Sequence, residues 1–339
     1  MGKYILKRCG YIVVVFLIVS FLMYSLYNLI PNDPARAELE PLRQTLKPQE
    51  YEQRYNDLRA QMGLDDPLVV RYLRWFGLWP DTDGKTFNGV LQGNFGYSNL
   101  YKRNVIEVIP DPMSNTIFIN IFSTIAALGI TIPLGIYCAV HKGKKFDQAT
   151  QVVTMLGYSI PVYITALVFM FFLAVYWRIF PVMGIKTAGI EYANNWEAFT
   201  DKLYHITLPV IVMTFGSLGG MTRYVRSAMI ESLSMDYIRT ARAKGLPEKK
   251  VINYHAFRNT LIPVVTILGG SLPSLFSGAL ITETLFSIPG IGKTAYDSMI
   301  VGDIPFTMFY LTFMAILTLL GNLIADLLYA AVDPRVRLS

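Results

Sequence analysis

The sequence predicts an all-α membrane protein with six transmembrane helices and a small extracytoplasmic helical cap between the first two. Of its 339 residues, 53% are hydrophobic and 16% are charged, whereas about a quarter of the residues in a soluble protein are charged. The apolar residues gather in long runs, and basic residues flank those runs. Because a backbone in hydrocarbon must satisfy its own hydrogen bonds, we expect each run to form a helix.

Six apolar runs are long enough to cross a bilayer, which takes about 20 helical residues. They lie near residues 10–30, 115–140, 152–177, 206–224, 263–286 and 306–332. Short basic segments at 3–8, 141–145, 226–258 and 335–337 all fall on one side of a six-span chain. That side, with both termini, is therefore predicted to be cytoplasmic. The basic residues form no stripe with interleaved aromatics, so the net charge of +6 does not indicate nucleic-acid binding.

The first run could also be read as a cleaved signal peptide, since its leading segment is basic. Its apolar stretch is too long for that and ends without a small-x-small cleavage site. We therefore expect residues 1–30 to form an uncleaved anchor helix.

Residues 31–114 are predicted to form the extracytoplasmic cap. Pro48 suits the first turn of a helix, and Tyr51, Tyr55, Leu58 and Met62 then recur at helical spacing to give one apolar face. Leu68, Tyr72, Leu73 and Phe76 form a second such face, followed by a turn-rich stretch at 77–96. An independent ligand-binding domain is the alternative, but so short a segment makes only a small core.

Two features mark the later part of the chain. The loop at 287–305 contains Pro289, Gly290 and Gly292, which break a helix and favour a re-entrant element at the outer mouth. Glu283 and Asp326 are ionisable residues in predicted spans, where burial of a charge is costly and often functional. A structural role is the alternative for each. Two isolated carboxylates near opposite faces do not suit an ion-coupled carrier.

Several kinds of chemistry have no motif in the sequence. It contains no Gly-x-x-x-x-Gly-Lys-Ser/Thr phosphate loop, no His-Glu-x-x-His metal site and no Gly-x-Ser-x-Gly nucleophile elbow. The chain therefore has no visible means of binding ATP itself and no visible metal site.

The segment from Tyr237 to Leu246 lies in a predicted cytoplasmic loop and combines small and basic residues. Asp236 is expected to cap a short helix, and Gly245 to end it in a left-handed turn. The small side chains of Ala241 and Ala243 would let the backbone of another protein approach closely. Tyr237 and Leu246 would serve as apolar anchors. A second helix is expected to start at Pro247 and Glu248. These residues fit a docking element and a solvated connector equally well.

This segment resembles the cytoplasmic coupling motif of the first permease in bacterial ABC importers of the dipeptide/oligopeptide (peptide/nickel) group. The stretch 237–246 is followed by His-Ala-Phe-Arg-Asn-Thr-Leu-Ile-Pro-Val at 255–264. The wider importer pattern of Glu-Ala-Ala, Gly and Ile-x-Leu-Pro is matched at Gly245 but not at 239–241 or 255–258. Similar family signatures occur at 32–34, 61–67, 93–98, 283–292 and 333–335.

The resemblance implies an ABC type I importer permease fold that comprises an N-terminal helix (1–30), a cap (31–114), a five-helix core (115–332) with a coupling loop (226–262), and a cytoplasmic tail (333–339). It implies a bacterial plasma-membrane importer of peptides, or of nickel chelates, glutathione or sugars. Its partners would be a second permease, two cytosolic ATPases that bind ATP and Mg²⁺, and an extracytoplasmic binding protein. The chain would be a transport subunit rather than an enzyme, with no cofactor or metal of its own. A stand-alone channel, a secondary carrier and a membrane-embedded enzyme are the rival classes.

The resemblance also implies roles for particular residues. The predicted outer-mouth gate consists of Glu283, Pro289, Gly290 and Gly292. The ATPase-coupling residues are predicted to be Asp236, Tyr237, Arg239, Ala241, Arg242, Ala243, Lys244, Gly245, Leu246, Glu248, His255 and Arg258.

Overall fold

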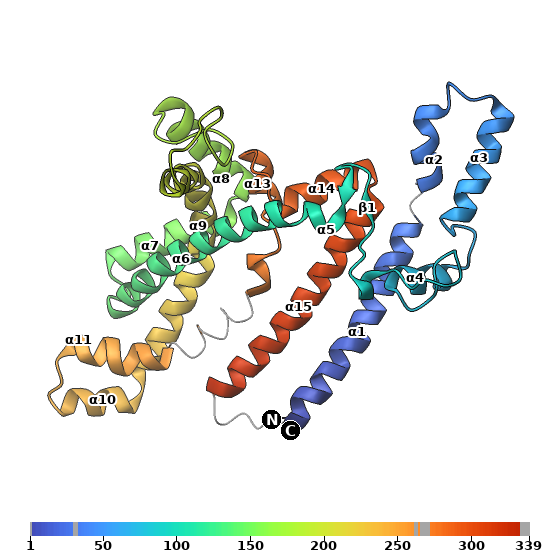
Figure 1. Cartoon of the computed structure of the whole chain (residues 1–339). Coiled ribbons are helices and arrows are strands. Elements are labelled where there is room, and N and C mark those ends of the chain that lie inside the picture. The colour runs from blue at the N-terminus through green and yellow to red at the C-terminus, as the bar shows by residue number, and fades with distance from the viewer. Residues whose placement is uncertain (1, 30–32, 261–263, 265–271, 333–339) are drawn as a thin grey trace. The chain divides into compact units, whose positions relative to one another are not determined.

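The computed structural model describes residues 2–29, 33–260, 264 and 272–332 of a mainly helical chain (Figure 1). The chain divides into two compact units. One unit comprises Gly2–Pro110 and Ala295–Leu319, and the other comprises Asp111–Thr294 with the end of the chain from Leu320. Each unit is considered by itself below.

In the described part of the chain, four helices are long and apolar enough to cross a membrane. They lie within α1 (Gly2–Asn28), α6 (Pro110–Val140), α9 (Asn195–Ser234) and α15 (Ile304–Val332). They correspond to the first, second, fourth and sixth predicted spans. Residues 263 and 265–271 of the predicted fifth span, 263–286, lie outside the described residues, and the described remainder contains no helix long enough to cross a membrane.

The predicted third span, 152–177, is not one straight helix. It is divided between α7 (Lys145–Ser159) and α8 (Val162–Phe169), which continues as the π-helix η3 (Met170–Tyr176), and the two arms are bent by 106°. Pro161 causes the break, because a proline disfavours the α conformation in the residue before it. Ile160 is accordingly extended, with φ −81° and ψ 126°. Taken as one broken span, the pair would make a fifth crossing.

Helix α9 is longer than predicted at both ends, since 206–224 was expected and Asn195–Ser234 is observed. Its start is fixed by Asn194, whose side chain accepts a hydrogen bond of 2.9 Å from the backbone N–H of Glu197. Polar residues at both ends extend the helix beyond the apolar run, and the helix continues through Pro209.

The first unit contains the helices predicted for the cap. They are α2 (Pro34–Leu39), the 3₁₀ turn η1 (Glu40–Leu42), α3 (Pro48–Gln61) and α4 (Leu68–Phe76). Pro48 begins α3 as predicted. The two predicted apolar faces are confirmed, since Tyr55 packs in one small core with α2 and Tyr72 packs in another with Tyr24 of α1. Tyr72 also exchanges a 2.8 Å hydrogen bond with Ser20 of α1.

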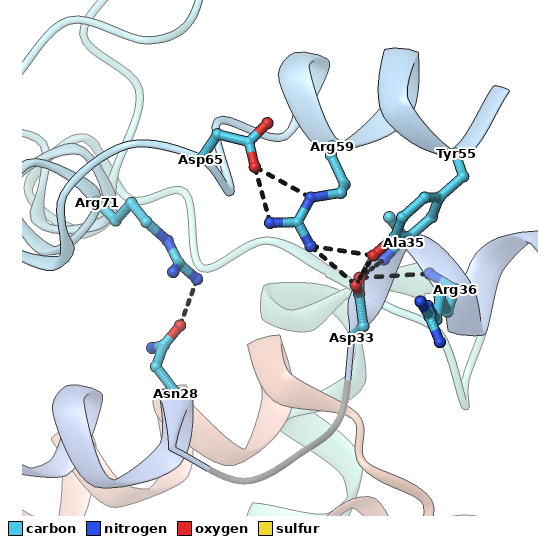
Figure 2. Close-up of polar contacts among 8 residues, drawn as sticks. All are labelled: Asn28, Asp33, Ala35, Arg36, Tyr55, Arg59, Asp65 and Arg71. Atoms are coloured by element: carbon cyan, nitrogen blue, oxygen red, sulfur yellow. Dashed lines mark hydrogen bonds and ion pairs between the residues drawn. The ribbon is translucent and has the colours of Figure 1, made fainter. Parts of the chain in front are cut away.

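A polar cluster around Asp33 joins α2 to α3 (Figure 2). Its carboxylate accepts hydrogen bonds from the hydroxyl of Tyr55, from Nη1 of Arg59 at 3.0 Å, and from the backbone at the start of α2. Partial burial pushes the pKa of Asp33 upward, but these hydrogen bonds outweigh it and hold the pKa below its ordinary 3.8. Arg59 also binds Asp65 at 2.7 Å, which ties α3 to the turn after it.

The segment between α4 and α6 is mostly loop. It contains η2 (Val90–Gln92), a two-stranded antiparallel sheet of β1 (Tyr97–Ser98) and β2 (Arg103–Asn104), and α5 (Val105–Val108). Ser98 donates a hydrogen bond to the buried carboxylate of Asp303, just before α15. This contact fastens the small sheet to the beginning of α15.

The second unit has two apolar clusters along α9. One gathers Ile119, Ala166, Ile206 and Leu208 at the N-terminal half of that helix, and the other surrounds Met229 near its C-terminal end. Between α7 and α9, Arg226 binds Asp147 through two hydrogen bonds of 2.7 Å. Asp147 is 2% exposed and Arg226 is 19% exposed, so the carboxylate is buried beside a half-buried guanidinium.

Beyond the undescribed residues, the chain is irregular before it becomes helical again. A 3₁₀ turn, η5 (Leu272–Leu275), precedes the short helices α13 (Leu280–Leu285) and α14 (Ile291–Val301). The described end of the predicted fifth span is therefore not a continuous helix. The helix break expected from Pro289 and Gly290 is confirmed, because it separates α13 from α14.

Candidate functional site

The predicted docking element is a helical hairpin beyond the end of α9 (Figure 1). Its first arm is α10 (Asp236–Ala243), and its second is α11 (Glu248–Lys250), continued by the π-helix η4 (Val251–Ala256). Gly245 connects the arms with φ +73°, so its predicted left-handed turn is confirmed.

The underside of this hairpin packs on α9. Ile238 and Ala241 are buried with Val251 and Ala256 against the Met229 end of α9. Ser232 of α9 strengthens the contact, since its hydroxyl is 2.8 Å from that of Tyr237 and donates a 2.9 Å hydrogen bond to the carbonyl of Ala256. A force applied to α10 would therefore be carried directly to α9.

Three details predicted for the hairpin are wrong. Asp236 is not a cap: it is the first residue of α10, its side chain is exposed, and it pairs with Arg239 at 3.4 Å. Ala241 is 5% exposed and belongs to the core. It lies three residues after the buried Ile238, on the same helix face. Leu246 is half-buried against that core and is not a free anchor.

Most of the other predicted coupling residues form an outward surface. His255 is half-buried, and the exposed members are Tyr237, Arg239, Arg242, Ala243, Lys244, Gly245, Glu248 and Arg258. Arg242 joins the two arms through hydrogen bonds of 2.6 and 3.1 Å to Glu248. These bonds lower the pKa of Glu248 from its usual value. The exposed surface thus combines basic side chains with the small residues Ala243 and Gly245.

The predicted gate residues are brought together around the side chain of Glu283. This carboxylate is 1% exposed and accepts hydrogen bonds from Thr116 at 2.7 Å, from the backbone N–H of Lys293 at 2.8 Å, and from that of Ala279 at 3.1 Å. Thr116 in turn accepts a 2.8 Å hydrogen bond from the backbone N–H of Ile291. The carboxylate therefore holds the start of α14 against α6.

This packing leaves no room for a side chain at Gly290 and makes a tight contact at Gly292. A Cβ atom on Gly290 would lie 2.2 Å from the carboxyl carbon of Glu283, and one on Gly292 would lie 3.0 Å from Oε2. Pro289 contributes its carbonyl, which accepts a 3.0 Å hydrogen bond from the side chain of Asn115. Glu283 thus has a clear structural role, the alternative that the sequence left open for it.

Sequence reasoning missed the partners of these residues. Asn115 and Thr116 were read only as part of an apolar span, although two adjacent polar residues at a span end are a visible signal. Asp147 and Arg226 were not paired, because the contact joins residues 79 apart. Asp326 lies half-buried in α15. In the described part of the chain, no group of three or more His, Cys, Asp or Glu residues could hold a metal ion.

Two family models match the chain. The model described as "Binding-protein-dependent transport system inner membrane component" matches residues 131–338. The model for the N-terminal part of such membrane components matches residues 1–120.

Curated relatives are similar over nearly the full length. The chain is 35% identical over 337 residues to the oligopeptide transport system permease protein AppB of Bacillus subtilis (strain 168). It is 32% identical over 354 residues to the dipeptide transport system permease protein DppB of Escherichia coli (strain K12). Against the di/tripeptide transport system permease protein DppB of Pseudomonas aeruginosa (strain UCBPP-PA14), the identity is 31%. Each comparison covers 99% of both chains.

A solved structure shares the fold. The chain matches an inward-facing structure of the MetNI methionine ABC transporter with a TM-score of 0.53 and 17% identity. The match covers 67% of this chain and 97% of the other.

Proposed function

Because the chain belongs to the family of binding-protein-dependent transport system inner membrane components, we propose that it is a permease subunit of an ATP-driven ABC importer for peptides. The observation that carries this proposal is the 35% identity across 99% of an oligopeptide permease. The chain forms part of the membrane pathway and performs no hydrolysis itself.

Peptide cargo follows from the relatives, whose names cover oligopeptides, dipeptides and tripeptides. Nickel chelates, glutathione and sugars are the alternative cargoes for the same architecture. A channel or secondary carrier is the alternative of another class, and it would work without ATPases.

The family description supports a location in the inner membrane of a bacterium. We place six helices across it, with both termini in the cytoplasm, and a cap formed by 31–114 outside. The proposed partners are a second, related permease, two cytosolic ATPases carrying ATP and Mg²⁺, and a binding protein that delivers the substrate to the cap.

The α10–α11 hairpin is the proposed coupling element. Its exposed face, centred on Ala243, would be seated in a groove of one ATPase, while its buried face moves with α9. Closure of the ATPases on ATP would then displace hairpin and α9 as one body and shift the pathway between its inward- and outward-facing states. The packing of Ile238 and Ala241 on α9 supports this rigid connection.

The Glu283 cluster is the proposed outer gate. It fixes the turn between α13 and α14, and three hydrogen bonds to one carboxylate make that turn a rigid unit. Opening would move this unit as a block.

Uptake by the purified complex tests the proposed function. The complex, isolated from its native membrane, is reconstituted in proteoliposomes with ATP on the ATPase side and binding protein on the other. We expect labelled alanine peptides to accumulate with ATP and not with ADP. Accumulation with ADP would favour a channel or carrier. Uptake of a nickel chelate, glutathione or a sugar without any peptide uptake would refute the peptide assignment.

A pair of alanine variants separates coupling from folding. Ala243→Glu places a charge on the exposed centre of the hairpin, so the complex should still assemble while ATP-driven uptake falls at least tenfold. Ala241→Glu buries a charge in the core and should prevent assembly. Normal uptake by Ala243→Glu would rule out this face as the ATPase contact.

A further inference from the structure

A cavity of about 440 Å³ lies within the second unit, between α6, α9 and the segment 274–279. Polar residues from all three elements line it: Asn120, Ser123, Thr124, Ser217, Ser274 and Ser277. Its volume falls within the range of about 300–1,000 Å³ that is typical of small-ligand sites.

The lining is uncharged, and polar side chains are interspersed in a surface that is more apolar than polar. Among the described residues that line the cavity there is no Asp, Glu, Lys, Arg or His. Hydroxyl groups can both donate and accept hydrogen bonds, and small apolar residues and methionines fill the spaces between them. Such a surface suits neutral amide groups, and it provides no counter-ion for a charged ligand. Methionine adapts its shape to different neighbours.

The backbone at the cavity is irregular inside a predicted membrane span. Between η5 and α13, residues 276–279 are not helical, and Gly278 has φ +72°. Non-helical backbone at membrane depth is tolerated where it is covered by protein or lines a cavity, and broken helices mark substrate sites in several transporters. Asn120 supports the segment by donating hydrogen bonds of 3.1 and 2.9 Å to the carbonyls of Ser274 and Leu275.

One wall of the cavity is hydrogen-bonded to the gate cluster. Ala279, which lines the cavity, donates its backbone N–H to Glu283 at 3.1 Å. A Cβ atom on the neighbouring Gly278 would lie 2.4 Å from the backbone nitrogen of Gly292. One wall of the cavity is therefore built on the same turn that forms the proposed gate.

We infer that this cavity binds the main chain of a peptide in transit, with the hydroxyl groups of α6, α9 and 274–279 contacting peptide amides. This inference rests on the proposed function and adds the binding surface within the pathway. Recognition of amides that all peptides share allows passage of many sequences. The alternative occupants are a helix of the second permease and lipid.

Cysteine substitution tests the inference in the complete transporter. The native thiols are removed as C9S and C138A, and single cysteines are placed at Ser217, which lines the cavity, or at Ser227, an exposed control on the same helix. Each complex is treated with a small thiol reagent, with and without labelled trialanine or pentaalanine delivered by the binding protein. Recovery of the partner subunits and ATP hydrolysis are measured alongside uptake.

We expect modification of the Ser217→Cys complex to reduce peptide uptake at least tenfold, to leave the complex assembled, and to be slowed several-fold by peptide. The Ser227→Cys complex should show neither effect. Unchanged uptake after full modification at Ser217→Cys, or modification unaffected by peptide, would overturn the inference. A Ser217→Cys thiol that reacts only after the second permease dissociates would also overturn the inference. It would mean that a helix of the second permease fills the cavity in the intact complex. If the cysteine-free parent transports no peptide while the wild type does, the assay is repeated with the native thiols retained. If the wild type itself transports no peptide, the result contradicts the proposed function.

Discussion

Removing the Glu283 carboxylate gives the sharpest test of how the gate cluster is held. In Glu283→Gln, the amide oxygen can replace Oε1 and keep the hydrogen bonds from Thr116 and Ala279. The new NH₂ group then faces the backbone N–H of Lys293, which loses its acceptor. In Glu283→Ala, all three donors lose theirs.

The magnitudes follow from these counts. A buried donor left unsatisfied costs about 1–3 kcal/mol. We therefore expect Glu283→Gln to destabilise the turn by about 1–3 kcal/mol. Glu283→Ala should cost at least about 3 kcal/mol, although the losses within one network are not strictly additive. Thr284, the exposed neighbour of Glu283 on α13, provides the control, and Thr284→Ala should change stability by less than about 0.5 kcal/mol.

Hydrogen exchange in the purified complex measures the effect locally. A loss of 1–3 kcal/mol corresponds to about 5- to 150-fold faster exchange, and peptides that cover residues 286–296 report on the amide of Lys293. We expect exchange to rise in the order Thr284→Ala, Glu283→Gln, Glu283→Ala, with the melting temperature falling in the same order. If Glu283→Ala exchanges at the wild-type rate, the carboxylate does not hold this turn, and the reasoning is refuted.

Three further predictions concern other contacts. Gly290→Ala should lower the melting temperature and peptide uptake, because its Cβ atom would lie 2.2 Å from the carboxyl carbon of Glu283; unchanged values for both would refute the required close approach. Asp147→Ala should destabilise the complex by about 3–5 kcal/mol, since it leaves Arg226 without its buried partner. The melting temperature should fall less in the double variant that also carries R226M. The pKa of Asp33 is lowered on folding, so its contribution to stability is present above about pH 4 and is lost as the pH falls through the folded-state value. Proteolysis of residues 33–61 should therefore become faster at low pH in the wild type and change little with pH in Asp33→Asn. Equal pH dependence in the two proteins would contradict this direction of the pKa shift.

Local sequence rules predicted part of the fold well. The apolar spacing of Tyr51, Tyr55 and Leu58 placed one face of α3 correctly, and Gly245 adopts the expected left-handed turn. Both predictions depend only on neighbours along the chain. The bend at Pro161 could also have been predicted from the restriction that proline places on Ile160. The two arms were predicted as one span because that prediction used only hydrophobicity.

The gate cluster could be predicted only in outline. Glu283, Gly290 and Gly292 lie within ten residues, and their grouping follows from the chain. Their contact with Thr116 bridges 167 residues, and no local pattern determines such a pairing. The reason for glycine at 290 is likewise visible only once the carboxylate of Glu283 is placed beside it.

The coupling hairpin shows a different limit. Small residues were taken to mean an exposed low surface, but Ala241 is small because it packs on α9 beside Ile238. Helical spacing from Ile238 carried that information. Ala243, two residues later, lies on the outer side and keeps the predicted exposure.

Isolation of the complex tests the central claim most directly. The tagged chain is recovered in mild detergent from its native membrane, and its partners are identified by mass. The account predicts a second multi-span permease together with one or two ATPases that carry a phosphate-binding loop. Recovery of the chain alone, or only with copies of itself, would contradict the assignment as an ABC importer subunit.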